Sequence, residues 1–206
     1  MRALLALFVC WLAGAVTASG QILLTAETGG AGNQAVTVAA NRLAPSDSGR
    51  LANLWAQYGY GLTDRVDVFA LYGNVTVFGE TQHYGGVGSN IALIGRHAHG
   101  LDVSFANNLT LPLTRHDQAS TALLTIALVA SRPFTIRSLV ITPYGGLSAL
   151  VPVGQRSAGV FTPPETTRTG VAGIVIPLRP TVSAYAEYDA GPSLRSAGVG
   201  LTLILK

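Results

Sequence analysis

Five charged residues of this chain have the placement of an interior electrostatic network. Each lies in, or at the end of, a segment in which apolar and polar residues alternate, on or near its polar face: Asp67, Arg96, Asp102, Arg132 and Glu187. If these faces line an enclosed interior, the opposite charges should pair, because a lone buried charge is costly. The pattern predicts either a structural set of ion pairs or a selectivity or binding network. The structural alternative is the simpler one.

Neutral polar residues occupy the same faces. We expect five of them to point inward and to form a hydrogen-bonded core: Asn53, Trp55, Gln57, Asn90 and Asn108. Buried polar groups are normally hydrogen-bonded, so such a core favours structure over chemistry.

Metal and hydrolytic chemistry have little support. His97 and His99 form a close pair with no carboxylate at ligand spacing, and the other two histidines are predicted near the opposite surface. A hydrolase needs a nucleophile, an adjacent base and an orienting group. The only local grouping, Ser120 with His116 and Asp117, lies in one predicted loop. The sequence therefore predicts no metal, no cofactor and no enzymatic activity.

The elements that would position these residues follow a period of two. The clearest segment, 101–111, has apolar residues on one face: Leu101, Val103, Phe105, Leu109 and Leu111. Its other face is polar: Asp102, Ser104, Asn108 and Thr110. Period two over roughly 9–11 residues is typical of a strand that crosses a bilayer between lipid and lumen. Aromatic residues in such segments are candidates for membrane girdles: Tyr58, Tyr60, Tyr72, Phe105, Tyr144 and Tyr188.

The composition supports a membrane protein built from strands. The chain is 49% hydrophobic and 11% charged, with a mean hydropathy of +0.40, whereas soluble domains carry about 25% charged residues. Beyond the N-terminal leader, no run approaches the roughly 20 apolar residues that a spanning helix needs. Because only helices and closed barrels satisfy every backbone hydrogen bond in lipid, we predict an all-β, antiparallel transmembrane β-barrel. The absence of a basic run gives no support to nucleic-acid binding.

The N-terminus has the features of a secretory signal peptide. Arg2 supplies a positive charge, residues 3–15 are apolar, and small residues at 17–20 offer cleavage sites. We expect residues 1–20 to be this leader. An anchor helix is the alternative, but the apolar stretch is short for a span. The single cysteine, Cys10, lies in the leader, so thiol chemistry is not expected in the mature chain.

Alternation and turn residues together predict ten strands. Residues 21–33 are expected to form a periplasmic or lumen-entering tail, and residues 34–206 to form the barrel. The predicted strands cover residues 34–42, 51–62, 66–77, 84–96, 101–113, 121–131, 137–151, 169–176, 181–189 and 195–205. A barrel of twelve strands with other boundaries is the alternative.

The connections between these strands alternate in length. Short turns are predicted near Asp64, Ala98, Phe134 and Arg179. Longer connections are predicted at 44–50, 78–83, 114–120, 154–168 and 190–194. Bacterial outer-membrane barrels have short periplasmic turns and longer outer loops. The alternation therefore predicts that both chain termini are periplasmic.

Several segments resemble a family of proteobacterial outer-membrane proteins. The run Tyr58-Gly59-Tyr60-Gly61-Leu62-Thr63-Asp64-Arg65-Val66-Asp67-Val68 resembles the YGLTDR strand–turn–strand signature of a transporter-like family associated with the meta-pathway of phenol degradation. Residues 24–28 are similar to that family's mature N-terminus, and residues 141–147 and 185–201 to its later strands. One departure is the end of the chain, Leu203-Ile204-Leu205-Lys206, where such barrels usually carry an aromatic residue.

The resemblance and the strand number together set the functional expectation. The resemblance implies a transport role in the outer membrane, with the barrel-assembly machinery, lipid and lipopolysaccharide as partners. Barrels of about eight strands are filled by their own side chains, whereas sixteen to eighteen strands leave an aqueous channel. We therefore expect a narrow or plugged lumen that aids passage of a small molecule, a hydrophobic one included, or serves a structural envelope role. The alternatives are a surface-binding or adhesion barrel, acting through its outer loops, and an outer-membrane hydrolase.

Overall fold

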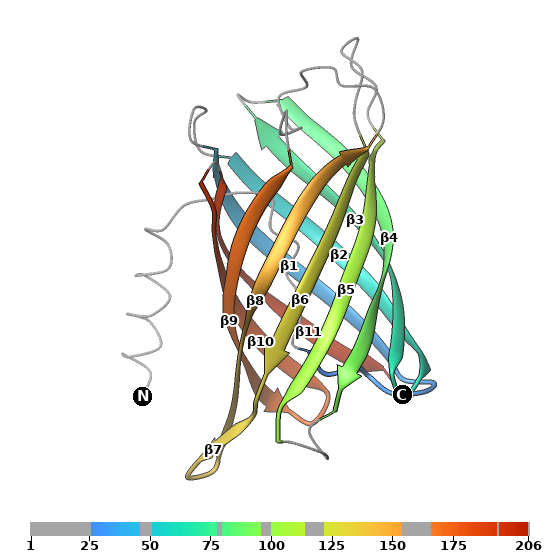
Figure 1. Cartoon of the computed structure of the whole chain (residues 1–206), viewed down its shortest axis with the longest axis vertical. Helices are drawn as coiled ribbons and strands as arrows, with labels where there is room; N and C mark the ends of the chain where they lie inside the picture. Colours follow the sequence, from blue (N-terminus) through green and yellow to red (C-terminus); the bar gives the residue numbers. More distant parts are fainter. Residues whose placement is uncertain are drawn as a thin grey trace.

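Strands make up most of the described residues, and Figure 1 shows them wrapped into a barrel. The computed structural model describes residues 26–45, 51–77, 80–95, 100–113, 122–153, 166–192 and 194–205. The strands are β1 (Gln34–Pro45), β2 (Leu51–Thr63), β3 (Val66–Val77), β4 (Glu80–Ile94), β5 (Asp102–Pro112), β6 (Ala122–Ser131), β7 (Phe134–Ile136), β8 (Leu139–Val153), β9 (Thr167–Arg179), β10 (Val182–Ala190) and β11 (Leu194–Leu205). Within the described ranges, no helix is long and apolar enough to cross a membrane.

Ten of these strands close into a single antiparallel barrel. Sequential neighbours pair from β1 to β6 and from β8 to β11, and β6 also pairs with β8. The ring closes where β1 pairs with β11, from Gln34 opposite Leu205 to Pro45 opposite Leu194. Every strand of the ring therefore has a partner on each side. The predicted ten-stranded fold is confirmed, and the twelve-stranded alternative is wrong because ten strands already complete the ring.

The short strand β7 extends the wall beyond the ring and is the main departure from the predicted boundaries. The sequence predicted a turn at Pro133-Phe134, but residues 134–136 pair with residues 139–141 of β8. The chain reverses instead at Arg137 and Ser138, where Arg137 has a φ of 60°. Pro133 has no backbone N–H, so it interrupts the pairing with β8 between the end of β6 and the start of β7, without reversing the chain.

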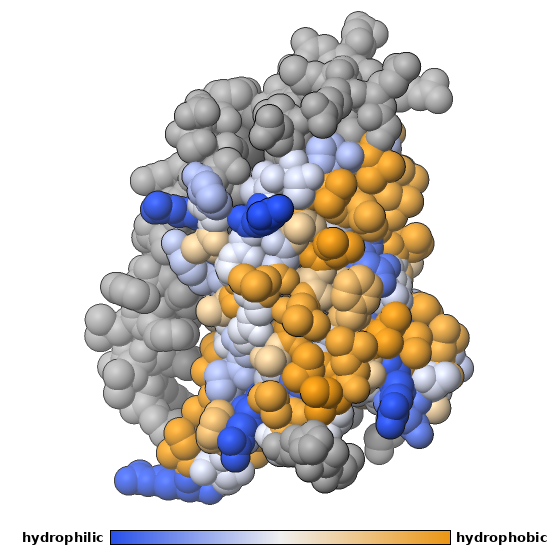
Figure 2. Space-filling model, in the orientation of Figure 1, coloured by the Kyte–Doolittle hydropathy of each residue, from blue (hydrophilic) through white to orange (hydrophobic). Residues whose placement is uncertain are grey.

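The two faces of the wall have the polarity that a membrane requires. Asp102, Ser104 and Asn108 are buried inside, whereas Leu109 and Leu111 are exposed on the outer face. Figure 2 shows apolar side chains gathered over much of the visible wall. The most exposed of the large apolar side chains on the outer face include Leu54, Val87, Leu147 and Leu201. This alternation confirms the period-two prediction for β5.

One girdle candidate lies inside the barrel rather than on its surface. Tyr58, Tyr72 and Tyr188 are exposed on the outer face, but Tyr144 is only 5% exposed. In the register, Tyr144 lies opposite Ser131 of β6 and Gly173 of β9, and both of those positions face inward. The placement of Tyr144 in the aromatic girdle is therefore wrong.

The turns at residues 64–65, 137–138 and 180–181 lie at one end of the barrel, which we call the short-turn end. The chain passes this end between β2 and β3, between β7 and β8, and between β9 and β10. The opposite end, where β1, β3, β5, β8 and β10 finish, is called the far end. Residues 1–25, which include the predicted leader, lie outside the described residues.

Candidate functional site in the barrel interior

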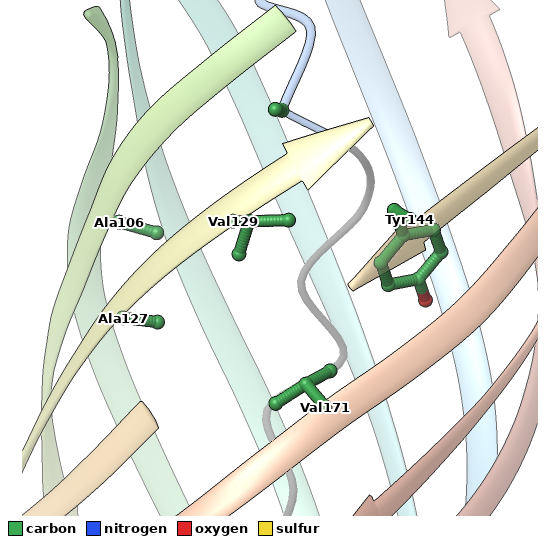
Figure 3. Packing of buried hydrophobic residues seen from close by; sticks show 6 residues of the cluster. Ala106, Ala127, Val129, Tyr144 and Val171 are labelled. Atoms are coloured by element: carbon green, nitrogen blue, oxygen red, sulfur yellow. The ribbon is translucent and has the colours of Figure 1, made fainter. Parts of the chain in front are cut away.

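Residues 26–33 precede β1 and contact the inner wall. The backbone N–H of Ala26 donates a hydrogen bond of 3.1 Å to Oγ of Ser131, the last residue of β6. Ala26 is 1% exposed and packs with five inward side chains from four strands: Ala106, Ala127, Val129, Tyr144 and Val171. Figure 3 shows these side chains pointing into one interior space. The segment therefore occupies part of the lumen.

Two aspartates of the β2–β3 hairpin hold the other part of this segment. The N–H of Gly29 donates to Oδ2 of Asp67 at 2.8 Å, and the N–H of Ala31 donates to Oδ1 of Asp64 at 3.3 Å. The hydroxyl of Thr28 donates to the carbonyl oxygen of Asp64 at 2.9 Å. Hydrogen bonds to carboxylates are stronger than those between neutral groups, so these contacts fix the segment against the hairpin.

Backbone contacts complete this attachment and explain why position 61 carries a glycine. The N–H of Gly32 donates to the carbonyl of Gly61 at 2.8 Å, and the N–H of Gly61 donates to the carbonyl of Asn33 at 2.9 Å. A Cβ atom at Gly61 would overlap the Gly30 carbonyl. Gly30 itself has a φ of 82°, in the left-handed region that favours glycine. The segment can approach the wall only because no side chain stands at these positions.

Aromatic rings cover glycines across neighbouring strands of the interior. Four cross-strand pairs have this arrangement: Phe69 with Gly88, Tyr84 with Gly73, Tyr144 with Gly173, and Tyr185 with Gly200. In each pair, a Cβ on the glycine would collide with the ring. An aromatic ring laid over a strand glycine restores the packing that the glycine lacks. The rings therefore fill the interior while lying close to the wall.

A polar cluster lies on the β8–β11 side of the interior. The hydroxyl of Tyr144 donates a hydrogen bond of 2.7 Å to Oε2 of Glu187 on β10. Glu187 and Asp189 are each 3% exposed, and Tyr185 is 4% exposed. Asp189 lies opposite Ser196 of β11 in the register. On the other side, the hydroxyl of Tyr84 donates to Oδ1 of Asn53 at 2.8 Å.

The structure brings three of the five predicted charges to the inner face. Asp67, Asp102 and Glu187 all occupy inward positions of the register. Arg132 follows β6 and is exposed, with its guanidinium carbon 5.5 Å from the centroid of the Phe134 ring. Ser131 faces inward, so the alternation of the strand turns the next residue, Arg132, to the outer side, although its backbone N–H still donates to the Pro143 carbonyl of β8. Arg96 lies outside the described residues.

Asp189 is an interior charge that the sequence argument did not identify. It lies two residues after Glu187, and alternate residues of a strand share a face. Period two alone was therefore enough to place it beside Glu187. Every arginine among the described residues has an exposed side chain, so the described interior is acidic.

The histidine and serine candidates fall mostly outside the described residues. His97, His99, His116, Asp117 and Ser120 are all in this group. His83 lies on β4, where its Nδ1 is 2.8 Å from the hydroxyl of Tyr72 and the two rings stack. Among the described residues, no three His, Cys, Asp or Glu side chains gather as a metal site would require.

The fold is similar to that of solved outer-membrane barrels. An outer-membrane channel from Pseudomonas putida F1 has a TM-score of 0.53 and 9% sequence identity, covering 90% of this chain and 100% of that chain. The N-terminal barrel domain of OprF from Pseudomonas aeruginosa has a TM-score of 0.42 and 13% identity, covering 85% and 99%. The NanC porin has a TM-score of 0.44 and 10% identity, covering 82% and 98%.

The similarity to the channel from Pseudomonas putida F1 supports the fold, a closed antiparallel barrel. No protein-family model matches the chain, and no curated protein matches its sequence.

Proposed function

We propose that this protein is an outer-membrane β-barrel that allows restricted passage of a small molecule through a lumen narrowed by its own side chains. The observation that carries the proposal is the attachment of residues 26–33 inside the short-turn end, through Asp64, Asp67 and Ser131. A barrel of ten strands encloses little more space than a barrel of eight, and eight-stranded barrels are filled by their own side chains. Residues 26–33 and the inward aromatic rings occupy part of that space, so they oppose free diffusion of hydrated solutes.

Membership of the transporter-like family associated with phenol degradation is part of the proposal. Its signature segment, residues 58–68, forms the hairpin between β2 and β3. The same hairpin supplies Gly61, Asp64 and Asp67, which hold residues 28–33, and Thr28 of the similar N-terminal segment 24–28 donates its hydroxyl to the Asp64 carbonyl. Two segments that carry the family resemblance therefore contact each other. This relation supports a common role for them in controlling the lumen, with a small molecule, a hydrophobic one included, as the cargo.

The proposed setting is the bacterial outer membrane, with lipid and lipopolysaccharide around the wall and the barrel-assembly machinery inserting it. The short-turn end, where β1 begins and β11 finishes, would face the periplasm. A surface-binding role would depend on residues 154–168, of which 154–165 lie outside the described residues. No contact among the described residues favours that alternative.

Conductance in planar bilayers tests the proposal. The double variant D64A/D67A removes both side-chain acceptors of the N–H groups of residues 29 and 31. We expect low conductance from the unchanged protein and a severalfold higher conductance from the double variant. Arg65→Gln is the matched control, since Arg65 is exposed in the same turn. A large, open conductance in the unchanged protein would contradict a narrowed lumen. Liposome swelling assays compare the rates at which small hydrophobic and small hydrophilic solutes pass through the barrel.

A further inference from the structure

Three arginines lie on the outer face of the barrel near its far end: Arg42 on β1, Arg168 on β9 and Arg195 on β11. All three side chains are exposed. Residues next to them in the chain are buried inside the barrel: Asn41, Thr167 and Ser196. Because successive residues of a strand face opposite sides of the wall, the arginines point outward. Figure 2 shows strongly hydrophilic side chains on the visible wall near this end, at the top of the view. We call the three residues the arginine patch.

The register brings two members of the patch together. Arg42 lies opposite Ala197 of β11, and Arg195 lies opposite Ala44 of β1. The two arginines are therefore diagonal neighbours on one face of a strand pair, about 7–8 Å apart, a spacing that long side chains can bridge. Arg168 is on β9, which is separated from β11 by β10 alone. Two guanidinium groups at this spacing can bind the same anion.

The four strands around the patch have no outward carboxylate. The only acidic residues of β1, β9, β10 and β11 are Glu187 and Asp189, and both are buried inside the barrel. Like charges at neighbouring positions of a sheet repel each other, and a low dielectric constant strengthens the repulsion. An anion bound between Arg42 and Arg195 would replace this repulsion with attraction.

The patch is continuous with the apolar outer wall. Every second residue of β11 faces outward, and Leu203, Leu201 and Val199 are the exposed apolar residues that lead along this face toward Arg195. A ligand that fits this surface has apolar chains for the wall and an anionic group where the wall ends. That combination is the chemistry of an anionic lipid rather than of a soluble ion.

We propose that the arginine patch binds a phosphate group of lipopolysaccharide, with the acyl chains of the lipid against the outer face of β11. The planar fork of N–H donors in arginine matches the oxygens of a phosphate. Lipopolysaccharide is the occupant because the far end faces outward in the proposed orientation, and this lipid carries phosphates directly above its acyl chains. The choice of lipid rests on the proposed outer-membrane setting, whereas binding is measurable on the purified protein without any passage.

Native mass spectrometry of the full chain in detergent provides the readout. The probe is diphosphoryl lipid A, and we expect the protein to retain it when the micelle is removed. Lipid A without phosphates has the same acyl chains, and phosphatidylglycerol and inorganic phosphate offer the phosphate from other sources. At equal concentrations, each of these three should be retained about tenfold less or weaker still.

Substitutions then assign the site. The double variant R42Q/R195Q should weaken lipid A binding by about tenfold or more, since it removes both charged donors. Arg179→Gln is the matched control, because Arg179 is exposed at the opposite end of β9.

A second substitution leaves every arginine in place. Ala190 is exposed and lies opposite Arg195 on β10, so Ala190→Glu puts a competing carboxylate beside that guanidinium. It should weaken lipid A binding, and Ala190→Gln should not. Circular dichroism checks that each variant keeps its β-structure.

The opposite results would overturn the site. Equal retention of lipid A without phosphates would mean that the acyl chains alone bind, and equal retention of phosphatidylglycerol would mean that any anionic lipid binds. Equal retention of inorganic phosphate, or unchanged lipid A binding in R42Q/R195Q, would contradict the proposal as well.

The two proposals fail separately. A large, open conductance with specific lipid A binding at the patch would overturn the narrowed lumen and keep the site. Restricted passage that responds to D64A/D67A, without specific lipid A binding, would keep the proposed function and overturn the site.

Discussion

The hydroxyl of Tyr144 on β8 donates a hydrogen bond to Oε2 of Glu187 on β10, although β9 lies between the two strands. The bond is possible because the Tyr144 ring lies over Gly173 of β9, where a side chain would block it. One tyrosine thus links three adjacent strands from inside the barrel.

Loss of this hydroxyl should destabilise the barrel. Tyr144→Phe removes the hydroxyl that donates to Oε2 of the buried Glu187. The loss should lower the free energy of unfolding by about 1.5–3 kcal/mol, the range for a hydrogen bond to a charged group. Urea unfolding in lipid vesicles, followed by Trp55 fluorescence, measures the change. Tyr188→Phe, on the outer face of β10, is the control and should have little effect. Equal unfolding midpoints for the two variants would show that the Tyr144–Glu187 bond contributes nothing.

A methyl group at Gly173 should be poorly tolerated. Its Cβ would overlap the Tyr144 ring, so Gly173→Ala should cost about 1–3 kcal/mol, as overpacking of a filled core does. Gly170 lies on the same strand, and a Cβ there would meet its nearest atom, the Ala190 carbonyl oxygen, at an ordinary 3.8 Å. Gly170→Ala should therefore change the free energy of unfolding by less than about 0.5 kcal/mol. The same urea titration compares the two, and a Gly173 variant as stable as the Gly170 variant would contradict the ring-over-glycine packing.

A charge on the middle of the outer wall should disturb membrane folding. Leu147 lies in the middle of β8 and is 71% exposed. Leu147→Arg should cost about 2–4 kcal/mol, the range for arginine at the bilayer midplane. Leu178→Arg, two residues before the turn at 180–181, should cost about 1 kcal/mol or less, because it lies near the interface. Similar costs at the two positions in vesicles would mean that the middle of the wall does not lie in lipid.

The orientation of the barrel is open to a labelling experiment. A membrane-impermeant maleimide on intact cells should label a cysteine at Glu165 and should fail to label one at Asp64, which lies in an exposed turn of the short-turn end. The one natural cysteine, Cys10, lies in the predicted leader, so the background should be low. Permeabilised cells provide the positive control for Asp64. The reverse labelling pattern would invert the proposed orientation.

Much of the fold could be predicted because a strand in a two-sided wall repeats every second residue. Once Leu101 and Leu109 are taken to face outward, the positions of Asp102 and Asn108 follow, and the structure agrees. The same rule placed Asn53, Trp55 and Gln57 inside, in register with Val75, Gly73 and Leu71. Period two required no knowledge of which strands are neighbours.

The interior contacts could not be predicted in the same way. The pairing of Tyr144 with Glu187 depends on the register of two strand pairs, and a shift of one residue would turn either side chain outward. The segment 26–33 has no repeating pattern, so nothing local in it indicates that Ala26 reaches Ser131, 105 residues away in the chain. The β7 extension depends on how a single proline interrupts an otherwise continuous pairing with β8.

The pairing of β1 with β11 has a consequence for the order of events in assembly. Its twelve residue pairs join the two ends of the barrel, and the first pair, Gln34 with Leu205, is 171 positions apart in the chain. Contacts this distant in sequence form slowly, because a long stretch of chain must be ordered before they contribute. Until β11 arrives, β1 presents one line of unpaired N–H and C=O groups, which lipid cannot satisfy. Closure of this seam therefore removes the last open edges of the sheet, and a partly formed sheet has to shield its β1 edge until then.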